Sequence, residues 1–139
     1  MPETSQLPAL LKLKNRLSTS DFTELLDVLT AVCNKLDDEV GWKSFDFEAF
    51  RKGIEICKLF PEDPLVALLR YEPGASVPKH QHKGLETILV LEGEQSDEHG
   101  NYSAGSLVLN PEDSIHSVWS NTGCVVLIQW ERPVLFLED

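Results

Sequence analysis

The spacing of apolar residues changes once along the chain, near Gly41. Before that point they recur every three or four positions from Leu7 to about Leu36, which is the spacing of amphipathic helices. Asp21 stands in an N-cap position, with Glu24 three residues later as in a capping box. The pattern therefore predicts a helical extension over residues 1–44, packed on the rest of the protein or at a dimer interface.

From residue 45 the pattern is that of strands. Apolar and polar residues alternate from Ile54 to Phe60, and further short apolar runs follow at intervals of about ten residues, separated by turn sequences rich in Gly, Pro, Asn and Asp. This regular spacing is typical of a small antiparallel sandwich or barrel. We therefore predict an all-β domain over residues 45–139. The apolar runs cover residues 54–60, 65–71, 87–91, 106–109, 125–130 and 134–137.

Several side chains on these runs carry individual expectations. Cys124 begins a strand with no base near it in the sequence, which indicates a buried small hydrophobe and not a nucleophile. His99 falls in a hairpin tip, and tips are exposed. Six residues are candidates for the barrel interior, where they would serve as core or as pocket lining. They are Tyr71, Leu89, Val108, Trp119, Ile128 and Trp130.

Composition and charge limit the class of function. The 139 residues carry 12 Lys and Arg against 23 Asp and Glu, a formal net charge of -11. A nucleic-acid partner is therefore not expected, because binding to phosphates requires a basic surface. No Lys or Arg occurs between Gly84 and Glu131, whereas eight acidic residues do. A cation would therefore be attracted to that part of the chain.

The cysteines and the first residues indicate a compartment. The three cysteines are far apart, odd in number and never in a C-x-x-C pair, so a disulfide framework or a Cys-rich zinc module is not expected. The opening run MPETSQLPALLKLKNRL has neither a basic start followed by an unbroken apolar core nor the length of a membrane span. These features favour a reduced, cytoplasmic protein without a membrane partner.

Two of the four histidines form the pattern His80-Gln81-His82. On an extended strand, residues i and i+2 point to the same face, so both imidazoles can turn toward one point. Glu86 shares their parity but would lie too far along a straight strand, so the chain must reverse. Gly84 permits a three-residue turn over residues 83–85, which would place Glu86 opposite His82 on the neighbouring strand.

A fourth ligand would come from elsewhere in the barrel. His116 follows the Asn110-Pro111 turn and is the remaining histidine in a strand context that could supply it. Three histidines and one glutamate form a mixed nitrogen and oxygen set that suits one divalent transition metal ion, which could be Fe, Mn, Ni, Cu or Zn. Such a set leaves room for water or a substrate. A lone His-x-His pair is usually without function, and it is Glu86, Gly84 and His116 that change this balance.

These residues resemble the motifs of a known family. Gly74, His80, His82, Glu86 and Gly93 stand at the spacings of the first cupin motif. Gly105, Pro111 and His116 match the second motif more loosely, which departs at Asp113, where the family has Gly, and at Ser120, where it has Asn. Asp tolerates a left-handed backbone, so the turn at Asp113 is expected to form.

More narrowly, residues 45–135 resemble the ChrR-type cupin, found at the C-terminus of certain anti-sigma factors and in stand-alone proteins. The resemblance implies a double-stranded β-helix barrel with a metal held by His80, His82, Glu86 and His116. It does not extend to the first forty residues, which have no histidine and one cysteine, Cys33, where those anti-sigma factors carry a His-x3-Cys-x2-Cys zinc run. A sigma-factor partner is therefore not expected.

Two classes of function remain open. The first is a small metalloenzyme of the cupin dioxygenase type, acting on an oxygen-bearing small organic molecule. The second is a regulatory or sensory module in which the pocket binds a metal or metabolite and the helices pass that state to a partner. Polar groups around the open coordination sites would favour the enzyme, and a dry, packed interior the sensor. No catalytic residue is predicted; the helices and exposed strand edges predict a homodimer.

Overall fold

The computed structural model describes residues 45–60 and 64–137. The chain divides at Phe45 into two units, and all the strands named here lie in the second, Asp46–Asp139. The predicted helices over residues 1–44, and their packing, lie outside the described residues. The strands are β1 (Glu48–Arg51), β2 (Ile54–Phe60), β3 (Leu65–Tyr71), β4 (Ser76–Gln81), β5 (Glu86–Asp97), β6 (Gly100–Ser103), β7 (Leu107–Asn110), β8 (Ile115–Trp119), β9 (Cys124–Trp130) and β10 (Leu135–Phe136).

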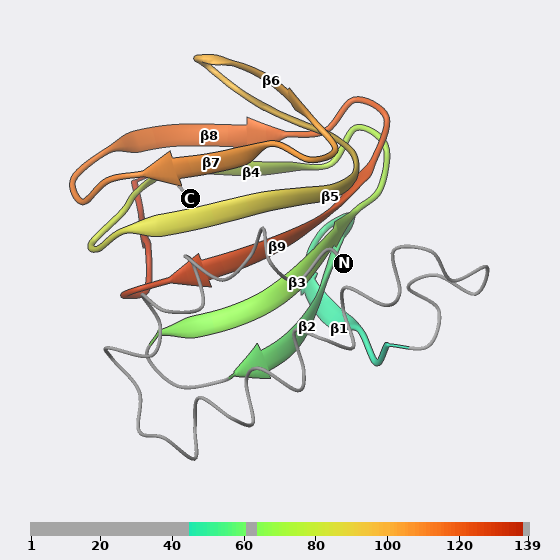
Figure 1. Cartoon of the computed structure of the whole chain (residues 1–139), viewed down its shortest axis with the longest axis horizontal. Coiled ribbons are helices and arrows are strands. Elements are labelled where there is room, and N and C mark those ends of the chain that lie inside the picture. The colour runs from blue at the N-terminus through green and yellow to red at the C-terminus, as the bar shows by residue number, and fades with distance from the viewer. Residues whose placement is uncertain (1–44, 61–63, 138–139) are drawn as a thin grey trace. The chain divides into compact units, whose positions relative to one another are not determined.

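The strands form two facing layers joined through β5 (Figure 1). The first layer runs in the order β1-β2-β3-β9-β5, with β7 on the far side of the first half of β5. The second layer contains the second half of β5 with β6 and β8, followed by β4 and β10. Every pairing is antiparallel, and the result is the curled barrel of the cupin fold, as the sequence predicted.

The core lies between the two layers and follows the alternation of the strands. Ile54 and Ile56 on β2, Ile88 and Val90 on β5, and Val126 on β9 are each at most 3% exposed. Successive side chains of a strand point to opposite faces, so a shift of one residue moves a side chain out of the core. Among the predicted interior residues, Tyr71 and Ile128 are buried in the core cluster, with Val108 and Trp130 packed against it. Leu89 and Trp119 are absent from it, and Leu89 alternates with the inward-facing Ile88 and Val90, so those two expectations were wrong.

One glycine allows β5 to serve both layers. Gly93 has φ of 72°, and a Cβ atom there would lie 2.1 Å from the carbonyl oxygen of Gly123. Only glycine accepts both the left-handed backbone and so close a neighbouring strand. The register between β5 and β9 shifts just before it, between Val90 and Glu92. The two ends of β5 therefore lie in different layers of the barrel.

The sequence predicted six of these ten strands as apolar runs and did not predict β1, β4, β6 and β8 from the apolar pattern alone. These are four to six residues long and carry polar side chains. Asp113 has φ of 74°, so the left-handed turn forms at that position as expected. In the described part of the chain, no helix has the length and apolar character to cross a bilayer.

Candidate metal centre

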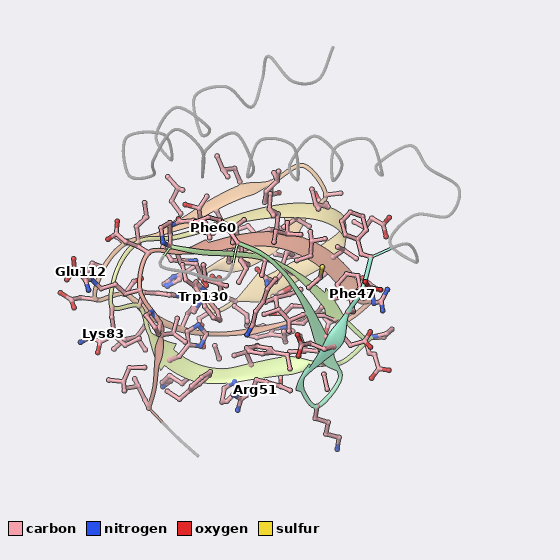
Figure 2. All side chains as sticks on the ribbon, turned by 90° about the horizontal axis from the view of Figure 1, so that it is seen from below. Phe47, Arg51, Phe60, Lys83, Glu112 and Trp130 are labelled. Atoms are coloured by element: carbon pink, nitrogen blue, oxygen red, sulfur yellow. The ribbon has the colours of Figure 1, made fainter. Side chains whose placement is uncertain are left out.

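His80, His82, Glu86 and His116 come together inside the barrel. One ligand atom from each lies within 4.8 Å of every other, and all four residues are buried, at 1–4% exposure. Trp130, which contacts Glu86, is labelled among the side chains inside the barrel in Figure 2. The structure thus brings together the four residues that the sequence singled out as a metal set.

The second layer supplies the three histidines. His80 lies on β4 and pairs directly with His116 on β8, so their side chains share one face. His82 follows the end of β4, and its backbone is held by hydrogen bonds from its N–H to Ser114 and from the Asp113 N–H to its carbonyl, at 2.9 and 2.8 Å. The ring centroids of the three imidazoles lie 4.7–5.1 Å apart.

Glu86 arrives from the other layer, which corrects a prediction. A hairpin over residues 83–85 was expected to place Glu86 opposite His82 on a paired strand. The strands β4 and β5 do not pair where this was expected; Glu86 pairs with Trp130 on β9 and with Asn110 on β7. The segment after His82 instead crosses from one layer to the other, so the carboxylate meets the imidazoles across the barrel interior. The four residues converge as predicted, but the predicted hairpin between His82 and Glu86 was wrong.

The environment of Nδ1 fixes which ring nitrogen of each histidine faces the group. Nδ1 of His80 lies 2.8 Å from the carbonyl oxygen of Pro78, and Nδ1 of His82 lies 3.1 Å from the carbonyl oxygen of Ser114. A carbonyl oxygen only accepts, so each Nδ1 carries the hydrogen and donates it. Both neutral rings therefore keep the lone pair on Nε2, which is the atom that a metal would bind.

Two of the three Nε2 atoms are buried without hydrogen-bond partners. Those of His82 and His116 have no partner with acceptable geometry. Nε2 of His82 nevertheless lies 2.9 Å from Oε1 of Glu86, and Nε2 of His116 lies 3.8 Å from the same oxygen. Lone pairs and a carboxylate that face one another at such distances repel unless a cation lies among them. The donor set therefore fits a divalent transition metal ion.

The carboxylate of Glu86 is held in place on both oxygens. Nδ2 of Asn110 donates to Oε1 at 3.0 Å, and Nε1 of Trp130 donates to Oε2. Burial alone would raise the pKa of this carboxyl, but a proton on Nε2 of His82 or His116, where a metal ion would otherwise lie, and the hydrogen bond from Trp130 hold it below its usual value. Burial lowers the pKa of His80 below its usual value. Both shifts favour an anionic glutamate beside neutral imidazole, which is the form that binds a metal.

Asp97 orients the fourth residue of the group and was missed by the sequence analysis. Its Oδ2 atom lies 3.1 Å from Nδ1 of His116. Its Oδ1 atom accepts from the backbone N–H of His99 at 2.8 Å, from that of Gly100 at 3.2 Å and from the hydroxyl of Tyr102 at 3.0 Å. Four donors hold one carboxylate that is itself buried. The sequence signal was an acidic residue at the start of a predicted hairpin tip, which does not reveal a partner 19 residues away.

A narrow cavity opens onto the group. The volume of this cavity that is open to the centre of a water molecule is about 20 Å³, which is room for one or two waters. Apart from the candidate ligand residues, the cavity is lined by one further polar pair, Gln95 and Tyr71. Nε2 of Gln95 donates to the hydroxyl of Tyr71 at 3.3 Å. Burial raises the pKa of Tyr71, so the phenol keeps its hydrogen. The cavity is lined by Phe50, Leu69, Tyr71, Val77, His80, Glu86, Ile88, Gln95, His116, Val118, Ile128, Trp130, Val134 and Phe136.

Two side chains outside the group behave as expected. His99 is exposed at the turn between β5 and β6, away from the four ligand residues. Cys124 is buried at the start of β9, and burial raises the pKa of its thiol to about 11. A thiol with so high a pKa is protonated at neutral pH and is a poor nucleophile.

Comparison with known proteins agrees with this fold and site. The model of the ChrR cupin-like domain matches residues 37–132. Anti-sigma-E factor ChrR of Cereibacter sphaeroides is 32% identical over 102 residues, which are 71% of this chain and 46% of that protein. The chain therefore spans about half the length of this relative.

Solved structures give the same result. The structure of Rhodobacter sphaeroides SigE in complex with the anti-sigma ChrR matches with a TM-score of 0.59 and 26% identity, over 67% of this chain and 53% of that one. An acetylacetone dioxygenase from Acinetobacter johnsonii matches with a TM-score of 0.63 and 17% identity, over 67% and 72% of the two chains. At that identity the likeness shows the fold alone. Because the family match covers more than half of its residues, this protein belongs to the ChrR cupin-like domain family.

Proposed function

We propose that this protein is a small metalloenzyme. It holds one divalent transition metal ion with His80, His82, Glu86 and His116, and it acts on an oxygen-bearing small organic molecule in the manner of a cupin dioxygenase. The observation that carries the proposal is the cavity, onto which His80, Glu86 and His116 open together with a polar pair that is no part of the metal set. A core that serves stability alone would not contain such a pair, because burying polar groups costs free energy of desolvation.

The residues around the site have separate roles in this proposal. A bound divalent ion would supply a Lewis acid or, as Fe(II), a centre for O₂ chemistry. Tyr71 accepts its hydrogen bond from Gln95, so its own O–H remains available to donate to an oxygen atom of the substrate. The apolar lining, which includes Ile88 and Val118, excludes bulk water and strengthens that hydrogen bond.

Metal analysis tests the metal set first. Protein purified without added metal is expected to contain close to one transition metal ion per chain. The double variant His80→Ala with His82→Ala is expected to contain none, and the variant His99→Ala provides the control, because this histidine is exposed and lies outside the group. Full stoichiometry and affinity in the double variant would overturn the assignment of the ligands.

Oxygen uptake tests the enzymatic reading. The metal-loaded protein is screened against diketones and hydroxylated aromatic compounds. With any substrate found, the variant Tyr71→Phe is expected to keep its metal and to lose at least about tenfold in turnover, because a preorganised donor at the reacting oxygen is removed. Unchanged turnover in this variant would remove Tyr71 from the mechanism.

A sensory function is the second candidate. It is favoured by the relative with the higher sequence identity, which is an anti-sigma factor, and by the solved structure of that protein with its sigma factor. These relatives also weigh against the expectation that this chain has no sigma partner, which stays a prediction. A sensor would bind metal or metabolite without turnover and would change its affinity for a sigma factor on loading, which pull-down with and without metal measures.

The predicted homodimer and the predicted cytoplasmic location remain predictions. Light scattering at micromolar concentration tests the first. A strict monomer at that concentration would contradict it.

A further inference from the structure

We propose that Arg51 selects the substrate by binding its anionic group, so that the site accepts a small organic acid. This inference rests on the proposed function, since it takes the other end of the acid to lie at the metal group. Arg51 ends β1, and its Cζ atom lies 4.4 Å from the centroid of the Phe136 ring. The same ring lies 5.8 Å from the ring of His80, with which Phe136 is paired between β10 and β4.

Arg51 stands at the mouth of the cavity. Phe136 lines the cavity and is 36% exposed, so this ring marks the place where the cavity meets solvent. Phe50 also lines the cavity. The same residue lines an open groove next to it, together with Arg51, Lys52, Ser76 and Pro78. Figure 2 shows Arg51 at the edge of the barrel and Trp130 in its interior. A ligand that reaches the group past Phe136 therefore passes the guanidinium.

The guanidinium has no anionic partner of its own. Among the described residues the guanidinium of Arg51 forms no ion pair or hydrogen bond, and it stacks on the ring of Phe136. Arg70 provides the comparison, because it also stacks on a phenylalanine, Phe47, but donates to Glu55 at 2.6 Å. A half-buried guanidinium has lost part of its hydration and gains from a carboxylate placed in its plane.

The charge of the chain makes this arginine unusual. The formal net charge is -11, and an anion approaching most of the surface would be repelled. The guanidinium of Arg51, which stacks on Phe136 beside the mouth, supplies positive charge there and attracts an anion. An acidic substrate needs such a group, whereas a neutral diketone does not.

The dimensions restrict the acid further. The cavity holds one or two waters, so the part of the ligand that enters it is about the size of a carboxylate or carbonyl group. The separation between the guanidinium and the His80 ring is no more than the 4.4 Å and 5.8 Å steps taken together. A short, unbranched acid with a second oxygen-bearing group fits both limits.

Binding of two matched acids tests the inference. Succinate and butyrate have the same four-carbon chain and differ in one carboxylate. Their dissociation constants are measured by calorimetry on the cobalt-loaded protein, after metal analysis has established loading. The wild-type chain is expected to bind succinate about tenfold more tightly than butyrate, on the scale of one partly exposed charge-assisted pair.

Two variants separate recognition from overall charge. Arg51→Met is expected to bind succinate and butyrate about equally, while its metal content stays unchanged. Lys58→Met removes the same charge from an exposed residue of β2 that lines neither the cavity nor the groove, and it is expected to keep the preference. An unchanged preference in Arg51→Met, an equal loss in Lys58→Met, or no preference in the wild-type chain would each overturn the inference. A protein that takes up no metal would overturn the proposed function as well, and the metal analysis reveals that before any acid is added.

Discussion

Strand β5 begins and ends with a buried carboxylate, and the two have different tasks. Glu86 opens the strand in the first layer and faces the three imidazoles, with its oxygens held by Asn110 and Trp130. Asp97 closes the strand in the second layer and binds the rear of one of those imidazoles, that of His116. Both are at most 6% exposed. One carboxylate is placed to hold a cation, and the other to orient a ligand for it.

The difference comes from the neighbours of each carboxylate and not from its chemistry. Glu86 keeps one oxygen 2.9 Å from an Nε2 atom that has no hydrogen to offer. Asp97 is surrounded by four donors and has no capacity left for a cation. A buried acid satisfied by hydrogen bonds orients other groups, whereas a buried acid that faces lone pairs calls for a positive charge.

The largest effect is expected from the glycine that separates the two halves of β5. Gly93→Ala should lower the free energy of unfolding by about 3 kcal/mol or more, because it adds backbone strain and a clash with Gly123. Gly105→Ala is the matched control, with φ of 94° but open space around the added Cβ atom, and it should cost about 1–2 kcal/mol. Urea unfolding measures both. Equal losses would show that the close approach of the strands at Gly93 has no energetic weight.

The next effect is on the carboxylate that faces the group. Glu86→Gln removes the charge, and the amide can accept from only one of its two donors, Asn110 and Trp130. Metal affinity should fall by more than the roughly 10- to 100-fold typical of losing an outer partner. Glu92→Gln, an exposed glutamate on the same strand, should leave affinity unchanged. Competition with a chelator measures both, and an equal affinity in the two variants would contradict the assigned role of Glu86.

A smaller effect is expected at the other end of the strand. In Asp97→Asn, the amide oxygen should take the place of Oδ1, where three donors meet, so that the amide N–H₂ faces Nδ1 of His116. The imidazole must then accept at Nδ1 and carry its hydrogen on Nε2, where it blocks metal binding. Metal affinity should fall by about tenfold.

Nitrogen chemical shifts of His116 report the change of tautomer directly. Tyr102→Phe removes one of the three donors to Oδ1 and should leave the tautomer as it is. A normal tautomer in Asp97→Asn would contradict the orienting role of Asp97.

The smallest effect concerns pH in the metal-free protein. Burial lowers the pKa of His80 below 6.5, and contacts that outweigh burial lower that of Glu86 below 4.5. In both cases the unfolded chain binds protons before the folded one does, so stability falls as the pH falls. The free energy of unfolding should decline below about pH 6.5 and again below about pH 4.5. Unfolding curves between pH 7.5 and 4 measure this, and constant or increasing stability would be the contrary result.

The sequence by itself determined the parts of this protein that follow from local pattern. The alternation from Ile54 to Phe60 and the repeated turn sequences indicated an all-β sandwich or barrel, because alternation of apolar and polar residues is typical of strands. The resemblance to cupins then selected the barrel. The pair His80 and His82, with Glu86 and His116 at family spacings, identified the residues of the group. In a strand, residues two apart share a face whatever the rest of the chain does.

Only the tertiary structure decided how those residues meet and what supports them. The absence of a hairpin between β4 and β5, the crossing between layers after His82 and the pairing of His80 with His116 are choices of strand order, which local pattern leaves open. Asp97 and Trp130 act on residues 19 and 44 positions away. Such contacts depend on which strands become neighbours when the barrel closes, and that is settled by the packing of the whole core.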